Sequence, residues 1–355
     1  MKKTTLMIAL LLATGGTAIA QNINKTEAKA LQTFLAQPAA TGGTNGSVLK
    51  YDGRSLSSIE GLKIEGGHVV EIDWRNKNLA GTLNLTGFSQ LSDLNVQGNK
   101  LSAVTLTNNG NLTKVNVGKN RITEFTVSNC PQILELRANR NRLSELDLSG
   151  VPLLKKLNLS GNQFEALDVS NSVNLESLNC MSNRLEQLNV NGCQNLKNLY
   201  AGYNELSGME LSGLANLLTL NVNNNKIEKL YLQNLPALST LMCSDNHMTA
   251  LTLNNCENMN EVWAPYNDLT SFTLENTQKL AFVNLEWNDL TYLNLSNMNF
   301  LQRLNVSNNQ LITLNVSFDP MLQTVILTNN DLLNDFETID TPMLSNVVGY
   351  ADWDM

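Results

Sequence analysis

The chain has 355 residues, of which 42% are hydrophobic and only 16% are charged, and its formal net charge is −8. A chain this acidic has no overall attraction for phosphate backbones, so nucleic acid is not expected as a partner. Length alone would favour two domains, but a repeat array has no single closed core and grows by stacking.

The first segment, residues 1–20, is typical of a secretory signal peptide. Lys2 and Lys3 form a charged start, residues 6–13 are apolar, and Ala18 and Ala20 make a small-x-small cleavage site. The apolar run is too short to anchor the chain in a bilayer, and no later segment approaches the roughly 20 apolar residues of a transmembrane helix. We therefore expect an exported protein (secreted, periplasmic or at the cell surface) without a transmembrane anchor.

Residues 21–69 are predicted to form an N-terminal cap, because a solenoid must cover the open end of its core. Asn24 and Glu27 match a capping box, and Ala28, Leu31 and Phe34 follow at helical spacing. This pattern predicts a short helix over about residues 25–37. Residues 38–47 are expected to form a loop, and residues 49–68 a connecting segment of the cap.

From Leu91 onward a pattern returns every 21 residues without insertion or deletion, and we number the coils from this residue. A looser unit, residues 70–90, precedes it with its first half shifted by one residue, so an array of about 13 units is predicted over residues 70–342. The landmark is an asparagine at position 9 of each regular unit: Asn99, Asn120, Asn141, Asn162, Asn183, Asn204, Asn225, Asn246, Asn267, Asn288, Asn309 and Asn330.

Within each unit the apolar positions are 1, 4, 6, 11, 14 and 16. Positions 4 to 6 show the two-residue period of a strand with one buried face, and positions 14 to 16 repeat it beyond a turn. We predict a leucine-rich solenoid with a parallel β-sheet on its concave face, an extended convex face, and little helix beyond the cap. The landmark carboxamide, which donates and accepts, is expected to satisfy backbone groups of its own and a neighbouring coil. Position 18 is usually Asn or Gly, which predicts a tight turn with positive φ.

These units resemble a known repeat family. The pattern LxxLxVxxNxLxxLxLSN looks like the leucine-rich repeats of secreted bacterial proteins, close to the internalin-like type and closer still to nested 21-residue repeats of exported proteins of Gram-negative bacteria. The resemblance covers roughly residues 70–342 and implies protein or glycan binding at the concave sheet. It carries over no individual ligand contact, because the residues at those positions vary.

The pattern decays after Asn330, where Leu333, Phe336 and Ile339 fall out of phase. Residues 343–355 are therefore expected to form a C-terminal cap. The segment ends with Asp352 and Asp354, whose charge should protect the last sheet edge from pairing with another strand.

No catalytic or metal-binding pattern is present. The cysteines fall three coils apart or on different sides of one coil, too far apart for disulfides, so buried free thiols are expected at Cys130, Cys180, Cys193, Cys243 and Cys256. His68 and His247 are too distant to share a site, and no zinc-protease, serine-hydrolase or phosphate-loop motif occurs. We expect no enzyme, no cofactor and no metal.

Outward-facing positions carry the clearest functional signal. Position 5 points out of the concave sheet and is Asn in seven of the twelve regular units, yet large rings or apolar groups replace small and polar residues at positions 3, 5 and 8 of coils six to ten. These residues are Tyr200, Tyr203, Met242, Trp263, Tyr266, Phe282 and Trp287. Aromatic side chains anchor interfaces, so the sequence predicts a ligand surface between residues 196 and 290. Aromatic packing between adjacent coils, without a ligand, would explain the same residues.

A second, basic patch is predicted in coils two to four. Its main residues are Lys114, Arg137, Arg140 and Arg142, with Lys119, Arg121 and Lys156 nearby. The patch suits an acidic partner or the acidic end of another copy of the chain, although a solvated face would look the same. Three functions remain: a protein- or peptide-binding module of adhesin or receptor type, a glycan-binding module, and a structural surface protein without a specific ligand. The sequence leaves the oligomeric state open.

Overall fold

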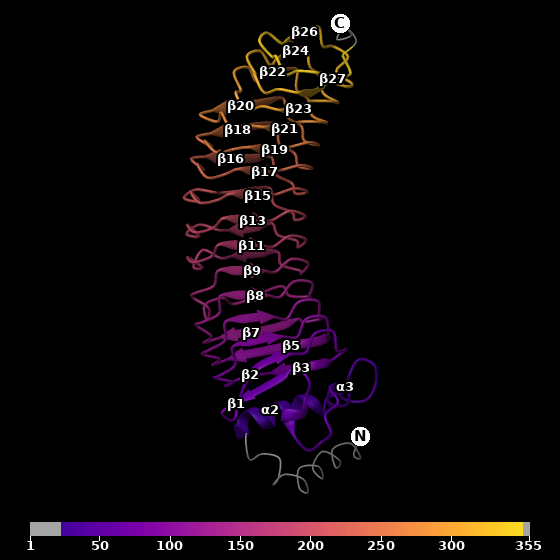
Figure 1. Cartoon of the computed structure of the whole chain (residues 1–355), viewed down its shortest axis with the longest axis vertical. Coiled ribbons are helices and arrows are strands. Elements are labelled where there is room, and N and C mark those ends of the chain that lie inside the picture. Colours follow the sequence, from indigo (N-terminus) through magenta and orange to yellow (C-terminus); the bar gives the residue numbers. More distant parts are fainter. Residues whose placement is uncertain (1–22, 351–355) are drawn as a thin grey trace. The chain divides into compact units, whose positions relative to one another are not determined.

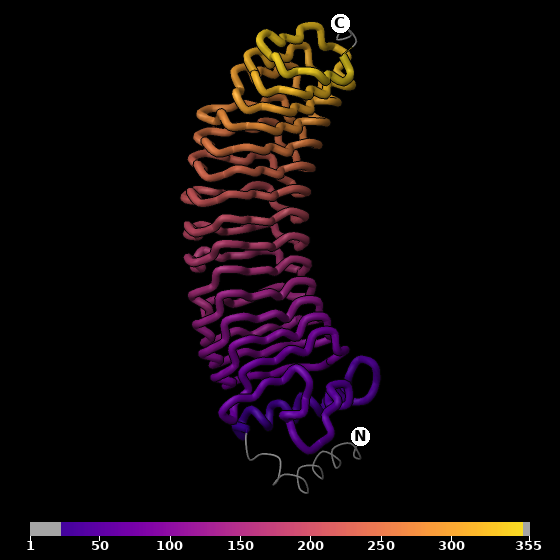
Figure 2. The backbone as a smooth tube through the Cα atoms, in the orientation of Figure 1, coloured from indigo at the N-terminus to yellow at the C-terminus, as the bar shows by residue number. Residues whose placement is uncertain are grey.

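The computed structural model describes residues 23–350, so the predicted signal peptide and the C-terminal Asp352 and Asp354 lie outside the described residues. The chain divides into two compact units, with the boundary between Gln163 and Phe164. Each unit is built from the same flattened coil, in which a short strand crosses one broad face and a second extended segment returns along the opposite face (Figures 1 and 2). The predicted leucine-rich-repeat solenoid with very little helix is confirmed.

The N-terminal unit begins with a helical cap. Helix α2 spans Lys25–Leu35, close to the predicted range, and the side chain of Asn24 accepts hydrogen bonds from the backbone N–H groups of Thr26 and Glu27. The buried face of α2 packs against the first coil, where the rings of Phe34 and Trp74 stack with centroids 5.7 Å apart. This apolar contact closes the N-terminal end of the core.

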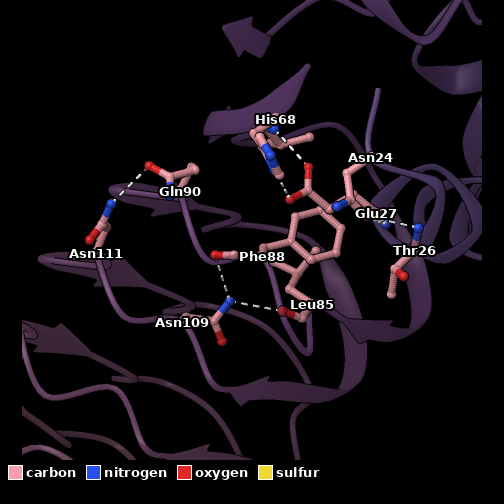
Figure 3. A network of polar contacts seen from close by, with 10 residues as sticks. Asn24, Thr26, Glu27, His68, Leu85, Phe88, Gln90, Asn109 and Asn111 are labelled. Atoms are coloured by element: carbon pink, nitrogen blue, oxygen red, sulfur yellow. Dashed lines mark hydrogen bonds and ion pairs between the residues drawn. The ribbon is translucent and has the colours of Figure 1, made fainter. Parts of the chain in front are cut away.

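The predicted capping box is only half formed, because Glu27 has a different role. Its buried carboxylate accepts a hydrogen bond from the backbone N–H of Val69 at 2.8 Å and lies 2.9 Å from Nδ1 of His68 (Figure 3). Glu27 therefore fastens the helix to strand β2 (His68–Asp73) of the main sheet. The predicted loop also holds a short helix, α3 (Asn45–Val48), and a 3₁₀ turn, η1 (Leu56–Ser58), follows it.

The main sheet of the N-terminal unit starts with an antiparallel hairpin of β1 (Leu62–Glu65) and β2 (His68–Asp73) and continues in parallel. The parallel strands are β4 (Asp93–Asn95), β6 (Lys114–Asn116), β8 (Glu135–Arg137) and β9 (Lys156–Asn158). On the opposite face, a second parallel sheet consists of β3 (Ala80–Asn84), β5 (Lys100–Thr107) and β7 (Glu124–Ser128).

The C-terminal unit repeats this arrangement with a longer main sheet, all of it parallel. Its strands are β11 (Ser177–Asn179), β13 (Asn198–Tyr200), β15 (Thr219–Asn221), β17 (Thr240–Met242), β19 (Glu261–Trp263), β21 (Phe282–Asn284), β23 (Arg303–Asn305), β25 (Thr324–Ile326) and β27 (Asn346–Val348). The strands occupy positions 3 to 5 of the unit, one residue earlier than predicted.

The opposite face of the C-terminal unit is divided into short parallel sheets. They are β10 (Ala166–Asp168) with β12 (Gln187–Asn189); β14 (Gly208–Met209) with β16 (Lys229–Gln233), β18 (Ala250–Asn254) and β20 (Ser271–Glu275); and β22 (Tyr292–Asn294) with β24 (Thr313–Asn315) and β26 (Asp335–Glu337). The extended character predicted for this face is confirmed.

The landmark asparagines form the ladder that the sequence predicts. Asn225 is typical: its Oδ1 accepts from the N–H of Leu206 in the preceding coil, and its Nδ2 donates to the carbonyls of Ala201 in that coil and Val222 in its own coil. Backbone groups that turn away from the sheet thereby find partners inside the core, where an unpaired group would cost about 1–3 kcal/mol.

The phase slip after Asn330 is a single inserted residue. Strand β26 pairs with β24 so that Asp335 lies beside Thr313, and β27 pairs with β25 so that Asn346 lies beside Thr324, both 22 residues apart. Main-sheet pairing therefore continues beyond residue 342, where the sequence analysis placed the end of the array. The one-residue shift predicted for the first unit has the same form, since Glu71 of β2 pairs with Asp93 of β4.

Candidate ligand-binding surface

The predicted ligand residues all lie in the C-terminal unit, and none of them is buried. Tyr203, Tyr266, Trp287 and Trp263 are 55%, 52%, 49% and 41% exposed, and the other three are half-buried. The interior, which holds the Leu and Val residues of positions 4 and 6, excludes all of them. The outward orientation that the prediction requires is therefore present.

The structure separates these residues into two groups. Met242 and Trp263 are direct neighbours on β17 and β19, and Phe282 follows on β21 beside Glu261. Tyr200, on β13, is separated from Met242 by Asn221 of β15. The denser group therefore lies on coils eight to ten, and Tyr200 and Tyr203 form an outlying pair on coil six.

Position 8 has a property that the sequence analysis missed: its backbone is left-handed in every regular coil of the described chain. Gly98, Gly161 and Asn224 occupy it in other coils, and such residues tolerate positive φ. Tyr203, Tyr266 and Trp287 adopt φ of 58°, 57° and 54° there, although a bulky residue in this region costs on the order of 1–2 kcal/mol. The solenoid does not require these rings, and it is strained by them.

Replacing Tyr203 by glycine should therefore stabilise the fold. Gly removes the left-handed strain, and the exposed Tyr203 ring loses little burial, so we expect the free energy of unfolding to rise by about 1 kcal/mol. Urea denaturation of the purified chain measures this change.

The matched control is Tyr231→Gly, at another exposed tyrosine in the middle of strand β16. Its backbone is extended, where glycine weakens a strand, so this variant should lose about 0.5–1 kcal/mol. Equal changes in the two variants would contradict the strain at position 8.

The asparagines at position 5 also have a structural role that was not predicted. In all seven units that have it, the Oδ1 atom accepts a hydrogen bond from the backbone N–H two residues later, as in Asn284 to Glu286 at 3.0 Å. A large residue at position 5 removes this acceptor. At Trp263 the residue two positions later is Pro265, which has no N–H to satisfy. After Met242, the N–H of Ser244 donates to Asn223 of the preceding coil instead.

The rings of the denser group are held by specific contacts. Tyr266 and Trp287 stack on adjacent coils, with centroids 5.9 Å apart and planes inclined by 12°. The Nε1 atom of Trp263 donates to Oε2 of Glu261 at 3.3 Å. Exposed carboxylates of Asp268 and Asp289 lie two residues after the stacked rings. The surface therefore combines apolar ring area with negative charge.

The predicted basic patch divides into two parts. Lys114 lies on β6 between Asp93 and Glu135 of the flanking strands, and Arg137 forms an ion pair with Glu135. These residues line a shallow depression on the main sheet, where burial and the carboxylate of Glu71 raise the pKa of Asp93. This part is a mixed-charge ladder rather than a basic surface.

The other part of the basic patch lies on the edge of coils two and three. Arg140 and Arg142 occupy positions 8 and 10 of coil three, and Lys119 and Arg121 occupy the same positions of coil two. All four side chains are exposed, and none forms an ion pair with another described residue. Four uncompensated cations therefore gather on this edge.

A third feature was not anticipated by the sequence analysis. Position 21 is Asn or Gln in six of the twelve regular units, but Phe300, Met321 and Met343 occupy it in the last coils and are 49%, 37% and 49% exposed. Phe318, three residues before Met321, is 46% exposed at the positive-φ turn of position 18, with φ of 64°. The replacement of Asn at position 21 could have revealed this exposed apolar feature from the sequence. It was missed because only the outward positions 3, 5 and 8 were compared.

The predicted buried, unpaired cysteines are confirmed. Burial raises the pKa of Cys180 to about 12 and that of Cys193 to about 11, so these thiols stay protonated and unreactive near neutral pH. Among residues 23–350, no cluster of His, Cys, Asp or Glu has an arrangement suited to a metal ion. In the same range, no helix combines the length and the apolar character needed to cross a bilayer.

The chain matches no protein-family model and no curated protein. Solved structures share its fold. The leucine-rich effector protein YopM of Yersinia pestis is 24% identical with a TM-score of 0.62, over 78% of this chain and 76% of that one. A leucine-rich-repeat protein of Leptospira interrogans is 20% identical with a TM-score of 0.50, over 77% and 92%.

The structure of PEPR1 with AtPEP1 has a TM-score of 0.69 at 19% identity and covers 92% of this chain. This chain spans about half of PEPR1 as solved there, 52%. At these identities the likeness establishes the leucine-rich-repeat fold. It identifies the chain as a scaffold of a type found in bacterial proteins and in complexes with other proteins.

Proposed function

We propose that the protein is an exported binding module that holds a protein or peptide against the aromatic surface of coils eight to ten. The observation that carries the proposal is the strain at position 8: Tyr266 and Trp287 stay exposed in a left-handed conformation that favours Gly or Asn. Strained residues persist where the surroundings hold them and where they serve a function.

The way in which the backbone accommodates Trp263 supports a binding role for the same surface. Its ring displaces an asparagine that satisfies a backbone N–H in other coils, and Pro265 removes the need for that acceptor. A solenoid under selection for stability alone would have no reason for either change. Large, rigid rings bury much area at low entropic cost, which suits the centre of a protein interface.

The ring geometry favours a protein or peptide over a glycan. A sugar binds on the flat face of an aromatic ring, but Tyr266 and Trp287 cover one another's facing sides. Their edges, the exposed Trp263 and the carboxylates of Asp268 and Asp289 remain accessible, and they suit side chains and backbone amides. Leucine-rich-repeat scaffolds of this kind generally bind other molecules without catalysis, and the PEPR1 structure is one example with a bound partner.

Export and an adhesin-like or receptor-like role belong to the same proposal. They are supported by the signal-like residues 1–20 and by the resemblance of the repeats to those of exported bacterial proteins. The protein would act in the periplasm, at the cell surface or outside the cell. We propose no enzymatic activity and no cofactor.

The double variant Trp263→Ala, Tyr266→Ala tests the surface. A hot-spot aromatic contributes at least about 2 kcal/mol, so the affinity for a captured protein or peptide should fall at least about 30-fold if one of the two rings is a hot spot and about 1,000-fold if both are. Capture from host or envelope extracts on the immobilised chain, followed by titration of each identified ligand, measures this loss.

The matched control is Tyr231→Ala, Tyr292→Ala, which removes two rings that are 65% and 57% exposed on the opposite face. Its affinity should stay unchanged. Retained affinity in the first variant would place the site elsewhere, binding only to a glycan array would favour a carbohydrate ligand, and no ligand at all would favour a structural surface protein.

A further inference from the structure

The two units carry opposite charge. Residues 23–163 include 16 basic and 11 acidic side chains, and residues 164–350 include 6 basic and 19 acidic side chains, giving formal charges of +5 and −13. The overall charge of −8 conceals this polarity. A molecule with such opposite halves is electrostatically complementary to another copy of itself.

The positive charge has a defined arrangement, which we call the cationic module: Lys119 and Arg121 on coil two, Arg140 and Arg142 on coil three. In each coil the two cations flank the landmark asparagine, which is fixed by hydrogen bonds to the core. Adjacent like charges on a ladder repel each other. The left-handed backbones of Lys119 and Arg140, with φ of 54° and 55°, add strain at positions that hold glycine in the flanking coils.

Coils nine and ten present the counterpart at the same repeat positions, which we call the aromatic–acidic module. Position 8 holds Tyr266 and Trp287, and position 10 holds Asp268 and Asp289. All four side chains are exposed. Among the described residues, Asp268 has one ion-pair partner, the ring of His247 at 3.7 Å, and Asp289 accepts a hydrogen bond from the neutral side chain of Gln310.

The two modules share one spacing. Each consists of two adjacent coils whose main strands pair in parallel register, so corresponding side chains repeat at the same strand separation of about 4.8 Å. Two cations of one module therefore face two carboxylates of the other without a mismatch in pitch. The aliphatic stems of the remaining two cations pack against the accessible edges of the aromatic rings.

We propose that a second copy of this chain is a partner of the aromatic–acidic module and docks there through its cationic module. This inference rests on the proposed function, because it assigns a protein partner to the same surface. The contact is heterologous, so a docked pair of copies keeps one free module of each kind, and association continues head to tail. Guanidinium–carboxylate pairs orient the contact between the two copies, and salt weakens this contact.

Sedimentation equilibrium of the purified full chain at about 0.01 M and about 1 M salt tests the proposal. We expect an average mass above that of one chain, rising with concentration, at low salt and a monomer at high salt. Arg140→Gln, Arg142→Gln and, separately, Asp268→Asn, Asp289→Asn should each weaken self-association about 10- to 30-fold. An equimolar mixture of these two variants has one intact pair of modules, so it should form a complex of two chains and stop there.

The matched control is Lys25→Gln, Lys29→Gln, which removes the same positive charge from the exposed face of α2 and should associate as the wild type does. A wild-type chain that stays monomeric at low salt overturns the proposal, and so do module variants that associate normally. If the monomeric wild type still captures a different protein through Trp263 and Tyr266, the proposed function stands and only the second copy is excluded as its partner.

Discussion

Asn225→Ala should destabilise the C-terminal unit by about 3–5 kcal/mol, a large part of the stability of a natural domain. The side chain is 8% exposed. It accepts from the N–H of Leu206 at 3.1 Å and donates to the carbonyls of Ala201 and Val222 at 3.1 and 3.0 Å. Alanine leaves the N–H of Leu206 unpaired in the core, at a cost of about 1–3 kcal/mol. It also removes one of the two side-chain hydrogen bonds that each of the two carbonyls accepts, at about 0.5–1.5 kcal/mol per bond, although Asn204 and Asn246 still donate to them. The midpoint of urea unfolding measures the loss.

The repeat architecture adds a second expected result. Each coil is stabilised by its neighbours, so loss of one ladder asparagine weakens the interfaces of its coil with the coils before and after it. The unfolding transition should therefore broaden. Asn195→Ala is the matched control, because Asn195 is exposed and bonds only the carbonyl of Val173 on the surface. It should cost less than about 0.5 kcal/mol. Similar losses at Asn195 and Asn225 would mean that the ladder does not hold the coils together.

The period of the sequence was sufficient to predict the fold because each coil repeats its own environment. A residue at position 4 or 6 has the same neighbours one coil before and one coil after, so leucine at these positions indicates a core without knowledge of any distant contact. The ladder followed from the same logic, since only a side chain that both donates and accepts can satisfy the turn in two coils. The cap helix was signalled by Asn24 and by the spacing of Leu31 and Phe34.

The parts that were missed depend on the backbone rather than on polarity. Position 8 holds Gly or Asn in five of the twelve regular coils, but Lys119, Ser182 and Tyr203 occupy it in others, so the preference for positive φ was obscured. The position-5 asparagines looked like neutral surface residues. Their hydrogen bond with the N–H two residues later does not change the alternation of apolar and polar residues in the sequence. Glu27 matched a capping box by spacing, and only the fold shows that β2 offers its carboxylate better partners.

The candidate ligand surface was predictable for a different reason. The repeats provide their own reference for each outward position, so Trp263 and Tyr266 stand out without any comparison to other proteins. Their separation from Tyr200 could have been predicted from the same register, because Asn221 occupies position 5 of the coil between Tyr200 and Met242. The basic patch divides because Arg137 forms an ion pair with Glu135 of its own strand, and Arg140 forms none with a described residue.

Asp319 is an exception to the repeat that leads to a second strong expectation. It occupies position 19, where Cys193 and Cys256 direct their Sγ atoms toward carbonyls of the preceding coil. The carboxyl is completely buried, with Oδ1 accepting from the N–H of Met298 at 2.6 Å and Oδ2 without a hydrogen-bond partner. Burial raises its pKa from 3.8 to about 7.

The direction of the pH effect follows from this raised pKa. Below about pH 4 the carboxyl is neutral in both states, and it costs nothing. Between about pH 4 and the folded pKa of about 7, the unfolded chain ionises and the folded chain does not, so the stability of the C-terminal unit falls as pH rises. Above about pH 7 the penalty is complete and amounts to about 4 kcal/mol, at 1.36 kcal/mol for each pKa unit.

Asp319→Asn should remove this dependence. Asparagine has the same shape, does not ionise, and brings a donor to the unpaired Oδ2 position. Asn109 has such a donor at position 19 of coil one, where its Nδ2 bonds the carbonyls of Leu85 and Phe88 (Figure 3). We expect little difference from the wild type near pH 4 and a stabilisation approaching about 4 kcal/mol near pH 8. Urea midpoints of both proteins across this range measure the difference.

The exposed Asp331→Asn is the matched control, since it removes the same charge from the following coil without a buried carboxyl. Its effect should stay small at every pH, because an exposed charge is solvated in both states. A stabilisation by Asp319→Asn that is the same at pH 4 and pH 8 would show that the gain comes from the new hydrogen bonds alone. A gain that grows with pH would show that the folded C-terminal unit keeps the carboxyl of Asp319 protonated near neutral pH. Ionisation of this buried carboxyl in alkaline solution would then destabilise the unit.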